Sequence, residues 1–232
     1  RDMSNQEKPT CASASDLFHR ALNCVDLGDM QQAEDLYQAS IRQYEQLYDD
    51  QYETPPQILA ALGNLALVYA DTGRYDQEAR ALEKALAYGR EFARCDENFL
   101  PRVVELENDL AFSYSRQGLF PRAEEHYRAA LETNEKTLSE YGEEVSERAL
   151  LRSAVLHNNL AVFYEKKIGD LPRAEEHYRA MLSDRRQLFR LDGNAHGADL
   201  KEALSRVAEF CRLAGRPEGA KALLEEAQGL DE

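Results

Sequence analysis

Large and small apolar residues alternate along this chain at helical spacing, and the pattern returns about every 45 residues. It is punctuated by glycines that follow one another after 45, 45, 51 and 46 residues. Within a unit, Ala66 stands seven residues before such a glycine and Leu82 stands nine residues after it. Spacings near three, four and seven residues put side chains on one face of a helix. The pattern predicts five units of two helices, joined at Gly28, Gly73, Gly118, Gly169 and Gly215.

A nine-residue segment, PRAEEHYRA, occurs unchanged at residues 121–129 and 172–180. Its proline suits the first turn of a helix, and the glycine before it suits the left-handed turn that ends the preceding helix. Pro217 takes the same place in the fifth unit, whereas Pro55, after the cap Thr54, and Pro101 are expected to open first helices. No period-two alternation competes, so the chain is predicted to be all-α.

The alanine, the glycine and the A-x3-Y step after it resemble the tetratricopeptide repeat, whose usual length is 34 residues. Residues 62–75 (LGNLALVYADTGRY) and 156–182 are similar to the longer subtype of kinesin light chains. The resemblance implies a right-handed α-solenoid of five antiparallel helix pairs, the superhelix of this family. We expect residues 1–12 to be a flexible leader, in part a cloning remnant, and 13–232 to be one domain. The expected repeats are 13–53, 54–98, 99–142, 143–193 and 194–230, with extra residues near 138–147.

In this family the first helix of each repeat lines a concave groove, so the resemblance places ligand contacts there. Nine residues before the glycine the family often has asparagine, whose amide can both donate to and accept from a peptide backbone. Six residues before it, apolar side chains predict an apolar floor, and the Lys, Asn and Arg set of a carboxylate clamp is missing. The alternative is that the asparagines bond neighbouring helices or face water. The predicted peptide-binding residues are Asn64, Leu67, Asn108, Asp109, Phe112, Asn158, Asn159, Val162 and Arg206.

The chain carries 28 Lys and Arg against 43 Asp and Glu, a formal net charge of −15. This charge argues against nucleic-acid and anionic membrane partners, because both require a positive field. No apolar run approaches the roughly 20 residues that span a bilayer, so a cytoplasmic protein is expected. The acidic residues of the second helices are expected mainly on the outer face, and could also steer a basic partner; they include Glu34, Asp35, Glu124, Glu125, Glu175 and Glu176.

Catalytic and metal-binding patterns were sought without success. The sequence has no G-x-x-x-x-G-K-[ST], G-x-S-x-G or H-E-x-x-H. His126 and His177 stand beside glutamates, but as equivalent positions of two repeats they are expected to be structural. Its cysteines lack metal-ligand spacing, and Cys24 and Cys211 fall on packing positions. We therefore expect no catalytic residue, no metal and no cofactor.

These observations predict a non-enzymatic scaffold or adaptor that binds a peptide segment of a partner protein, with hydrophobic anchors, in its concave groove. Two alternatives remain open. The chain could form homo-oligomers through its C-terminal helix, which carries Leu223 and Leu224. It could also be a peptide-sensing regulatory domain.

Overall fold

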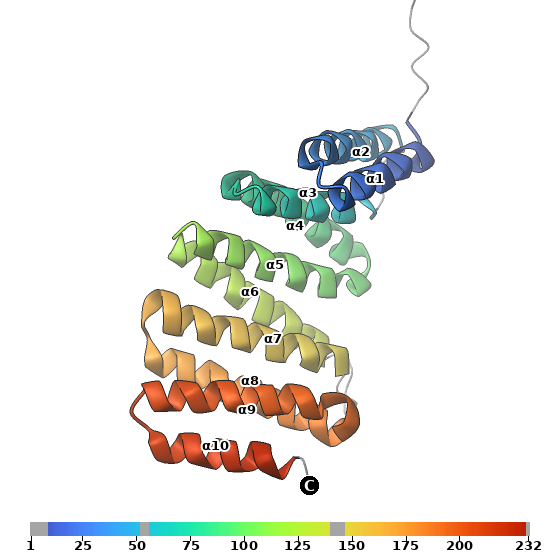
Figure 1. Ribbon diagram of the computed structural model, residues 1–232. Coiled ribbons are helices and arrows are strands. Elements are labelled where there is room, and N and C mark those ends of the chain that lie inside the picture. The colour runs from blue at the N-terminus through green and yellow to red at the C-terminus, as the bar shows by residue number, and fades with distance from the viewer. Residues whose placement is uncertain (1–8, 52–55, 140–146, 231–232) are drawn as a thin grey trace, which may run out of the picture. The chain divides into compact units, whose positions relative to one another are not determined.

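The computed structural model describes residues 9–51, 56–139 and 147–230, and these residues form helices and turns without any strand (Figure 1). The predicted all-α repeat fold is confirmed. Thr54, Pro55, the connection at 140–146 and most of the leader lie outside the described residues. The helices are α1 (Cys11–Asp26), α2 (Met30–Gln51), α3 (Ile58–Asp71), α4 (Tyr75–Cys95), α5 (Leu100–Arg116), α6 (Phe120–Ser139), α7 (Glu147–Phe163), α8 (Leu171–Leu191), α9 (Gly193–Leu213) and α10 (Pro217–Gly229), with a 3-10 turn η1 (Glu97–Phe99) and a π-helix η2 (Tyr164–Ile168).

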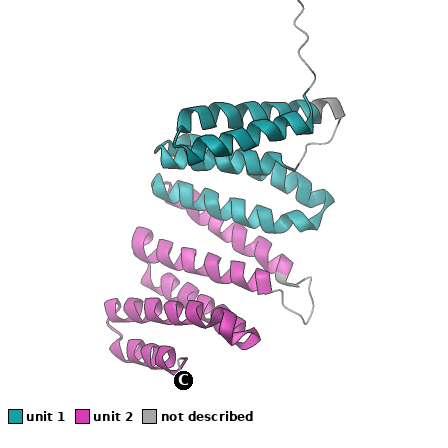
Figure 2. Ribbon diagram, turned by 45° about the vertical axis from the view of Figure 1, so that its right-hand side comes forward, with its two compact units in different colours: residues 1–118 teal, residues 119–232 magenta. Residues whose placement is uncertain are grey.

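The chain divides into two compact units, residues 1–118 and residues 119–232 (Figure 2). In unit 1, α1 packs on α2 and α3 packs on α4, while α2 contacts α3 and α4 contacts α5. In unit 2, α6 contacts α7, and the pairs α7 with α8 and α9 with α10 pack in the same way, with α8 against α9. The first helices α1, α3, α7 and α9 therefore lie against their own second helices, and α3, α5, α7 and α9 lie against the second helix of the preceding repeat.

The loop glycines have the left-handed backbone that the sequence predicted, with φ between 72° and 79° at all five. At the end of α3, the amide of Gly73 donates to the carbonyl of Ala70 at 3.0 Å, and the amide of Arg74 donates to that of Tyr69 at 2.8 Å. This bonding pattern satisfies the last carbonyls of a helix and requires a positive φ, which glycine adopts without strain. The alanine before each glycine is buried, as expected, which allows the paired helices to approach closely.

The fourth repeat accommodates its extra residue as a π-helix. In the sequence, the alanine of this repeat stands one residue farther from its glycine than in the other four. In the structure, the segment between them contains η2, which ends at Ile168 and is capped by Gly169. A π-helix takes one residue more per hydrogen-bonded turn than an α-helix, so it absorbs an insertion without shifting the residues on either side.

Glutamates on the second helices connect neighbouring repeats, and the expectation that they lie on the outer face is wrong for Glu34. Its side chain is buried, and it accepts hydrogen bonds from Arg74 at 2.7 Å and Tyr69 at 3.1 Å. In unit 2, Glu124 is half-buried and accepts from Arg173 and Tyr164. The following repeat covers these carboxylates, which a helical wheel of one repeat cannot show. Asp35, Glu125 and Glu176 are exposed as expected, whereas Glu175 is half-buried.

The arginines of these ion pairs also lie on aromatic rings of their own repeat. Arg74 lies 4.7 Å from the centre of the Tyr69 ring, and Arg173 lies 4.3 Å from that of Tyr164. Stacking on an aromatic ring stabilises a guanidinium group that is partly removed from water. The junctions formed by Glu78 with Arg116 and by Glu175 with Arg216 have the same design, on Phe112 and Phe210 respectively. Each unit thus contains two junctions held by the same combination of groups.

Candidate functional site

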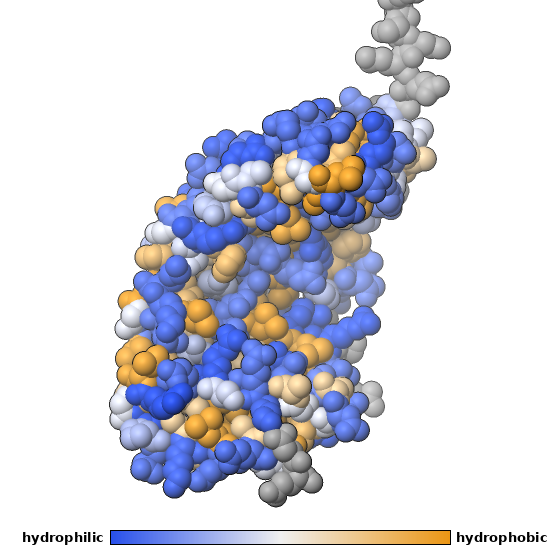
Figure 3. All heavy atoms as spheres, in the orientation of Figure 1, coloured by the Kyte–Doolittle hydropathy of each residue, from blue (hydrophilic) through white to orange (hydrophobic). Residues whose placement is uncertain are grey.

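A groove in unit 1 lies between the first helices α3 and α5 and encloses about 830 Å³. Two large apolar side chains of these helices are conspicuously exposed there, Leu67 at 61% and Phe112 at 53%. On the face drawn in Figure 3, apolar residues form separate patches amid hydrophilic ones. Exposed apolar side chains that share a concave surface are typical of binding sites for proteins and peptides.

Two polar side chains line this groove without an ion pair to any described residue. Asn64, on α3, is half-buried, and its side-chain amide has no hydrogen bond to any described residue. Asp109, on α5, forms no ion pair within the described part of the chain. Asp109 is exposed as a residue, but partial burial of its carboxyl raises its pKa, an effect that Arg102 and Asn108 partly oppose. The groove therefore offers a free amide and a carboxylate beside its apolar surface.

Both arginines of the groove are engaged by acidic residues of the protein itself. Arg102 pairs with Glu105 at 2.9 Å, and a Cβ atom on Gly63 would lie 2.8 Å from its Nη2 atom. Arg116 pairs with Glu78, a buried carboxylate that also accepts from Ser113 at 3.0 Å. Burial raises the pKa of Glu78, whereas Ser113 and Arg116 hold it down. Gly63 leaves space for Arg102 against α3. Each of the two arginines is neutralised by an acidic partner within the protein.

The corresponding groove of unit 2, between α7 and α9, is much smaller, at about 110 Å³. Asn158 and Arg206 line it. Arg185 of α8 reaches Asp199 of α9 at 2.7 Å, and Arg206 pairs with Glu202 at 3.0 Å. Charged side chains that pair with one another occupy the space that is open in unit 1.

The structure thus distributes the predicted site residues over two grooves. Asn64, Leu67, Asp109 and Phe112 line the groove of unit 1, and Asn158 and Arg206 line that of unit 2. Asn108, Asn159 and Val162 line neither of these, and all three are half-buried. Other residues that line the unit 1 groove were not predicted, among them Gly63, Asp71, Asn98, Phe99 and Arg102. The sequence did mark two of these positions, a glycine in the middle of a helix and an arginine directly after Pro101.

Two histidines meet within unit 2, His157 on α7 and His177 on α8. Their Nδ1 atoms are 3.0 Å apart, and the ring of Tyr164 stacks on His177 with an angle of 11° between the planes. Such a contact needs a hydrogen on one Nδ1 and a lone pair on the other. Burial, reinforced by His157, lowers the pKa of His177 to about 4. His177 is therefore a packing residue, as expected, but its partner was missed; His157 occupies the register of buried Leu62.

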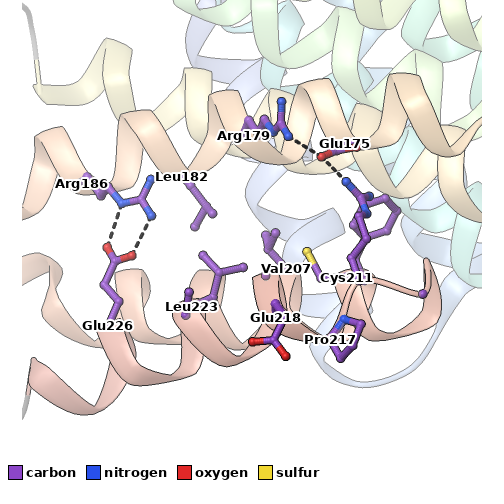
Figure 4. A pocket seen from close by; sticks show the side chains of 15 residues that line it. Glu175, Arg179, Leu182, Arg186, Val207, Cys211, Pro217, Glu218, Leu223 and Glu226 are labelled. Atoms are coloured by element: carbon purple, nitrogen blue, oxygen red, sulfur yellow. Dashed lines mark hydrogen bonds and ion pairs between the residues drawn. The ribbon is translucent and has the colours of Figure 1, made fainter.

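A second cavity of unit 2, of about 750 Å³, lies between α8 and α10 (Figure 4). Leu182 and Leu223 point toward one another across it (Figure 4). Arg186 and Glu226 close one end through two hydrogen bonds of 2.8 and 2.7 Å. At the other end Arg179 and Arg216 both pair with Glu175. The cavity is thus apolar in its middle and internally paired at both ends.

Among the described residues, no three His, Cys, Asp or Glu side chains are placed to hold a metal ion. Over the same residues, no helix combines the length and apolar character needed to cross a membrane. Cys24 is buried and Cys211 is half-buried, in keeping with their packing positions, while Cys11 and Cys95 are exposed.

Comparison with known proteins identifies the repeat. Residues 12–91 and 108–140 match family models described as tetratricopeptide repeat. The structure is similar to that of BtubC (BKLC) from P. vanneervenii, with 25% identity and a TM-score of 0.71 over 95% of this chain and 80% of that one. No curated protein sequence matches at a significant level.

Two further solved structures share the fold. One, from Podosopora anserina, has nearly identical TPR-like repeats of the kinesin light chain type; it is 15% identical with a TM-score of 0.59, covering 96% of both chains. The other is the quorum sensor NprR of B. thuringiensis, 17% identical with a TM-score of 0.55 over 92% of this chain and 52% of that one. The matched models identify tetratricopeptide repeats at residues 12–91 and 108–140, and the solved structures show that the fold is the repeat solenoid seen in kinesin light chain-like proteins.

Proposed function

We propose that this protein is a non-enzymatic scaffold that binds a peptide segment of a partner protein in the unit 1 groove. The observation that carries the proposal is the pairing of two exposed apolar side chains, Leu67 and Phe112, with the free amide of Asn64 in one groove. Apolar side chains of a peptide would gain by leaving water on Leu67 and Phe112, and Asn64 would fix the peptide backbone through its donor and acceptor.

The structural neighbours support a role in binding proteins. NprR is described as a quorum sensor, and Acl4, similar over 94% of this chain with a TM-score of 0.51, is described as an assembly chaperone of RpL4. Their identities of 17% and 18% show the shared fold alone. For this chain, the groove itself is therefore the stronger support.

The proposal is tested with peptides selected from a random phage-displayed library on the full-length chain. Leu67→Ala, Phe112→Ala and Asn64→Ala should each weaken the selected peptides about tenfold, the effect of losing about 1.4 kcal/mol. Leu213→Ala removes an equally exposed leucine, at 67%, from outside the groove and should leave binding unchanged. Equal affinity for wild type and all three groove variants would refute the assignment.

Self-association is a second candidate, favoured by the apolar cavity between α8 and α10. Leu223 lines that cavity and Leu224 beside it is 37% exposed, so a second copy could cover both. Light scattering at high concentration should then show a dimer that Leu223→Asp returns to monomer. A monomer at every concentration would remove this candidate and leave the groove proposal untouched.

A further inference from the structure

We propose that the unit 1 groove selects basic peptides, binding a Lys or Arg side chain at Asp109 between apolar residues that pack on Leu67 and Phe112. This inference rests on the proposed function and adds the chemistry of the partner. The supporting observation is that some charged side chains of the groove form no ion pair with another described residue.

The groove contains three acidic residues and two arginines among its lining residues. Both arginines are already compensated, Arg102 by Glu105 and Arg116 by Glu78. Asp71 and Asp109 remain, and neither forms an ion pair with a described residue. The free groove is therefore negative in its uncompensated charge, which favours a cationic ligand group.

Asp109 is better placed than Asp71 to hold that group, because it stands on α5 three residues before Phe112 and so shares the helix face of that apolar side chain. Asp109 is exposed as a residue, yet partial burial of its carboxyl raises the pKa, which reflects the cost of keeping this carboxylate charged. A ligand ammonium or guanidinium would offset that cost and would lower the pKa again. An acidic ligand residue at the same place would add a second negative charge and be rejected.

The apolar neighbours define the rest of the ligand. Leu67 on α3 and Phe112 on α5 occupy equivalent places, six residues before their glycines, on the two helices that flank the groove. A peptide that contacts both passes about one helical turn from Asn64 and Asp109, which stand nine residues before the same glycines, so a Lys or Arg side chain between its apolar residues can reach Asp109. The segment that fits has a basic residue with apolar residues close to it on both sides.

Unit 2 provides an internal contrast. Its groove has the same helix arrangement, yet both of its arginines are engaged by Asp199 and Glu202, and only about 110 Å³ is open. No uncompensated carboxylate of the kind seen at Asp109 lines it among the described residues. The selectivity for a cation is therefore expected from unit 1 alone.

The test uses the displayed peptide library on the full-length chain, followed by one synthetic selected peptide. We expect enrichment of Lys or Arg flanked by apolar residues, and tenfold or weaker binding to Asp109→Asn. Replacing the basic residue of the peptide by Gln should cost the same factor for wild type and almost nothing further for Asp109→Asn. Asp35→Asn, an equal charge change at an exposed site on α2, should have no effect.

Three outcomes would overturn the inference. Selected peptides that need Leu67 and Phe112 but are uncharged or acidic, and are indifferent to Asp109→Asn, would refute the basic ligand and leave the proposed function standing. Peptides that ignore Leu67 and Phe112 as well, or the absence of any enriched peptide, would refute both. A dimer that Leu67→Asp returns to monomer would assign the groove to a second copy instead.

Discussion

The two units build the same groove from the same helix arrangement, yet one is open and the other is filled. The difference is concentrated at equivalent positions: Gly63 and Gly89 of unit 1 correspond to Asn158 and Arg185 of unit 2. Gly89 and Arg185 both stand 16 residues after their loop glycine, and only the arginine can reach across to the next first helix. In a repeat protein, a few side chains on a common scaffold therefore decide which groove is open.

The largest expected effect comes from giving unit 1 the arginine of unit 2. Gly89 is buried, and a Cβ atom there would lie 3.3 Å from Leu106 Cδ1 and 3.5 Å from Val103 Cγ2. Gly89→Arg must place a charge in this tight contact, so the free energy of unfolding should fall by about 3 kcal/mol or more despite the better helix propensity.

Urea unfolding measures this change, and Ala87→Arg is the matched control on the exposed side of the same helix. The control should alter stability by no more than about 0.5 kcal/mol. A Gly89→Arg protein as stable as wild type would show that packing at Gly89 does not separate the two grooves.

The next effect compares the ion pairs at the repeat junctions. Arg116→Ala leaves the buried Glu78 with Ser113 as its remaining hydrogen-bond donor, and should cost about 2–4 kcal/mol. In unit 2, Arg216→Ala leaves Glu175 half-buried and still paired with Arg179, so the loss should stay within about 1 kcal/mol. Chemical denaturation of both variants checks the order, and equal losses would contradict it.

A smaller effect is expected from opening the groove of unit 2. The Arg185 side chain is 16% exposed and its partner Asp199 is 51% exposed, so Arg185→Ala loses packing of its stem but strands no buried charge. Unfolding should become easier by about 1–2 kcal/mol. Arg206→Ala, which removes an exposed pair within one helix, is the control and should cost less than about 0.5 kcal/mol. If Arg206→Ala lowers the free energy of unfolding by more than Arg185→Ala does, the ion pair between Arg185 and Asp199 is not what holds the groove closed.

The smallest expected effect is a histidine-linked pH dependence in unit 2, where His157 and His177 replace the apolar Leu62 and Ala81 of unit 1. The pKa of His177 is about 4 in the folded protein and near 6.5 unfolded, so the unfolded chain takes up its proton first as the pH falls. The contribution of neutral His177 to the free energy of unfolding is therefore fully present above pH 6.5 and is lost as the pH falls from 6.5 to about 4. Below that range this contribution changes no further. Since His177 is only partly buried, the loss should be about 1 kcal/mol.

Other charges around the pair modify this dependence. Glu176 favours protonation of His177, whereas Arg128 and Arg173 oppose it, and the half-buried Asp184 favours protonation of His157. Hydrogen exchange at pH 7.5 and 5.0, measured separately for peptides of each unit, should show faster exchange at α7 and α8 beyond the intrinsic pH effect. His177→Ala should abolish that difference, and an unchanged difference would exclude His177 as its source.

Much of the fold could be predicted from the sequence because the same pattern recurs in each repeat. Five glycines, their preceding alanines and the prolines after them mark helix ends, where backbone conformation depends on the local sequence. The register nine and six residues before the glycines likewise located Asn64, Leu67, Asp109 and Phe112, which the structure brings into one groove. The burial of Glu34 was missed because its partner Arg74 belongs to the next repeat.

The sequence by itself therefore determined the helical repeats, their turns and the face that each first helix presents, since these depend on spacing within about 45 residues. Only the tertiary structure decided which of these faces is open, which arginines are compensated, and that His157 meets His177. These features depend on distances between side chains of different helices, and a one-dimensional repeat does not encode such distances residue by residue. For the same reason, only the folded structure shows that the unit 1 groove is open and the unit 2 groove is closed.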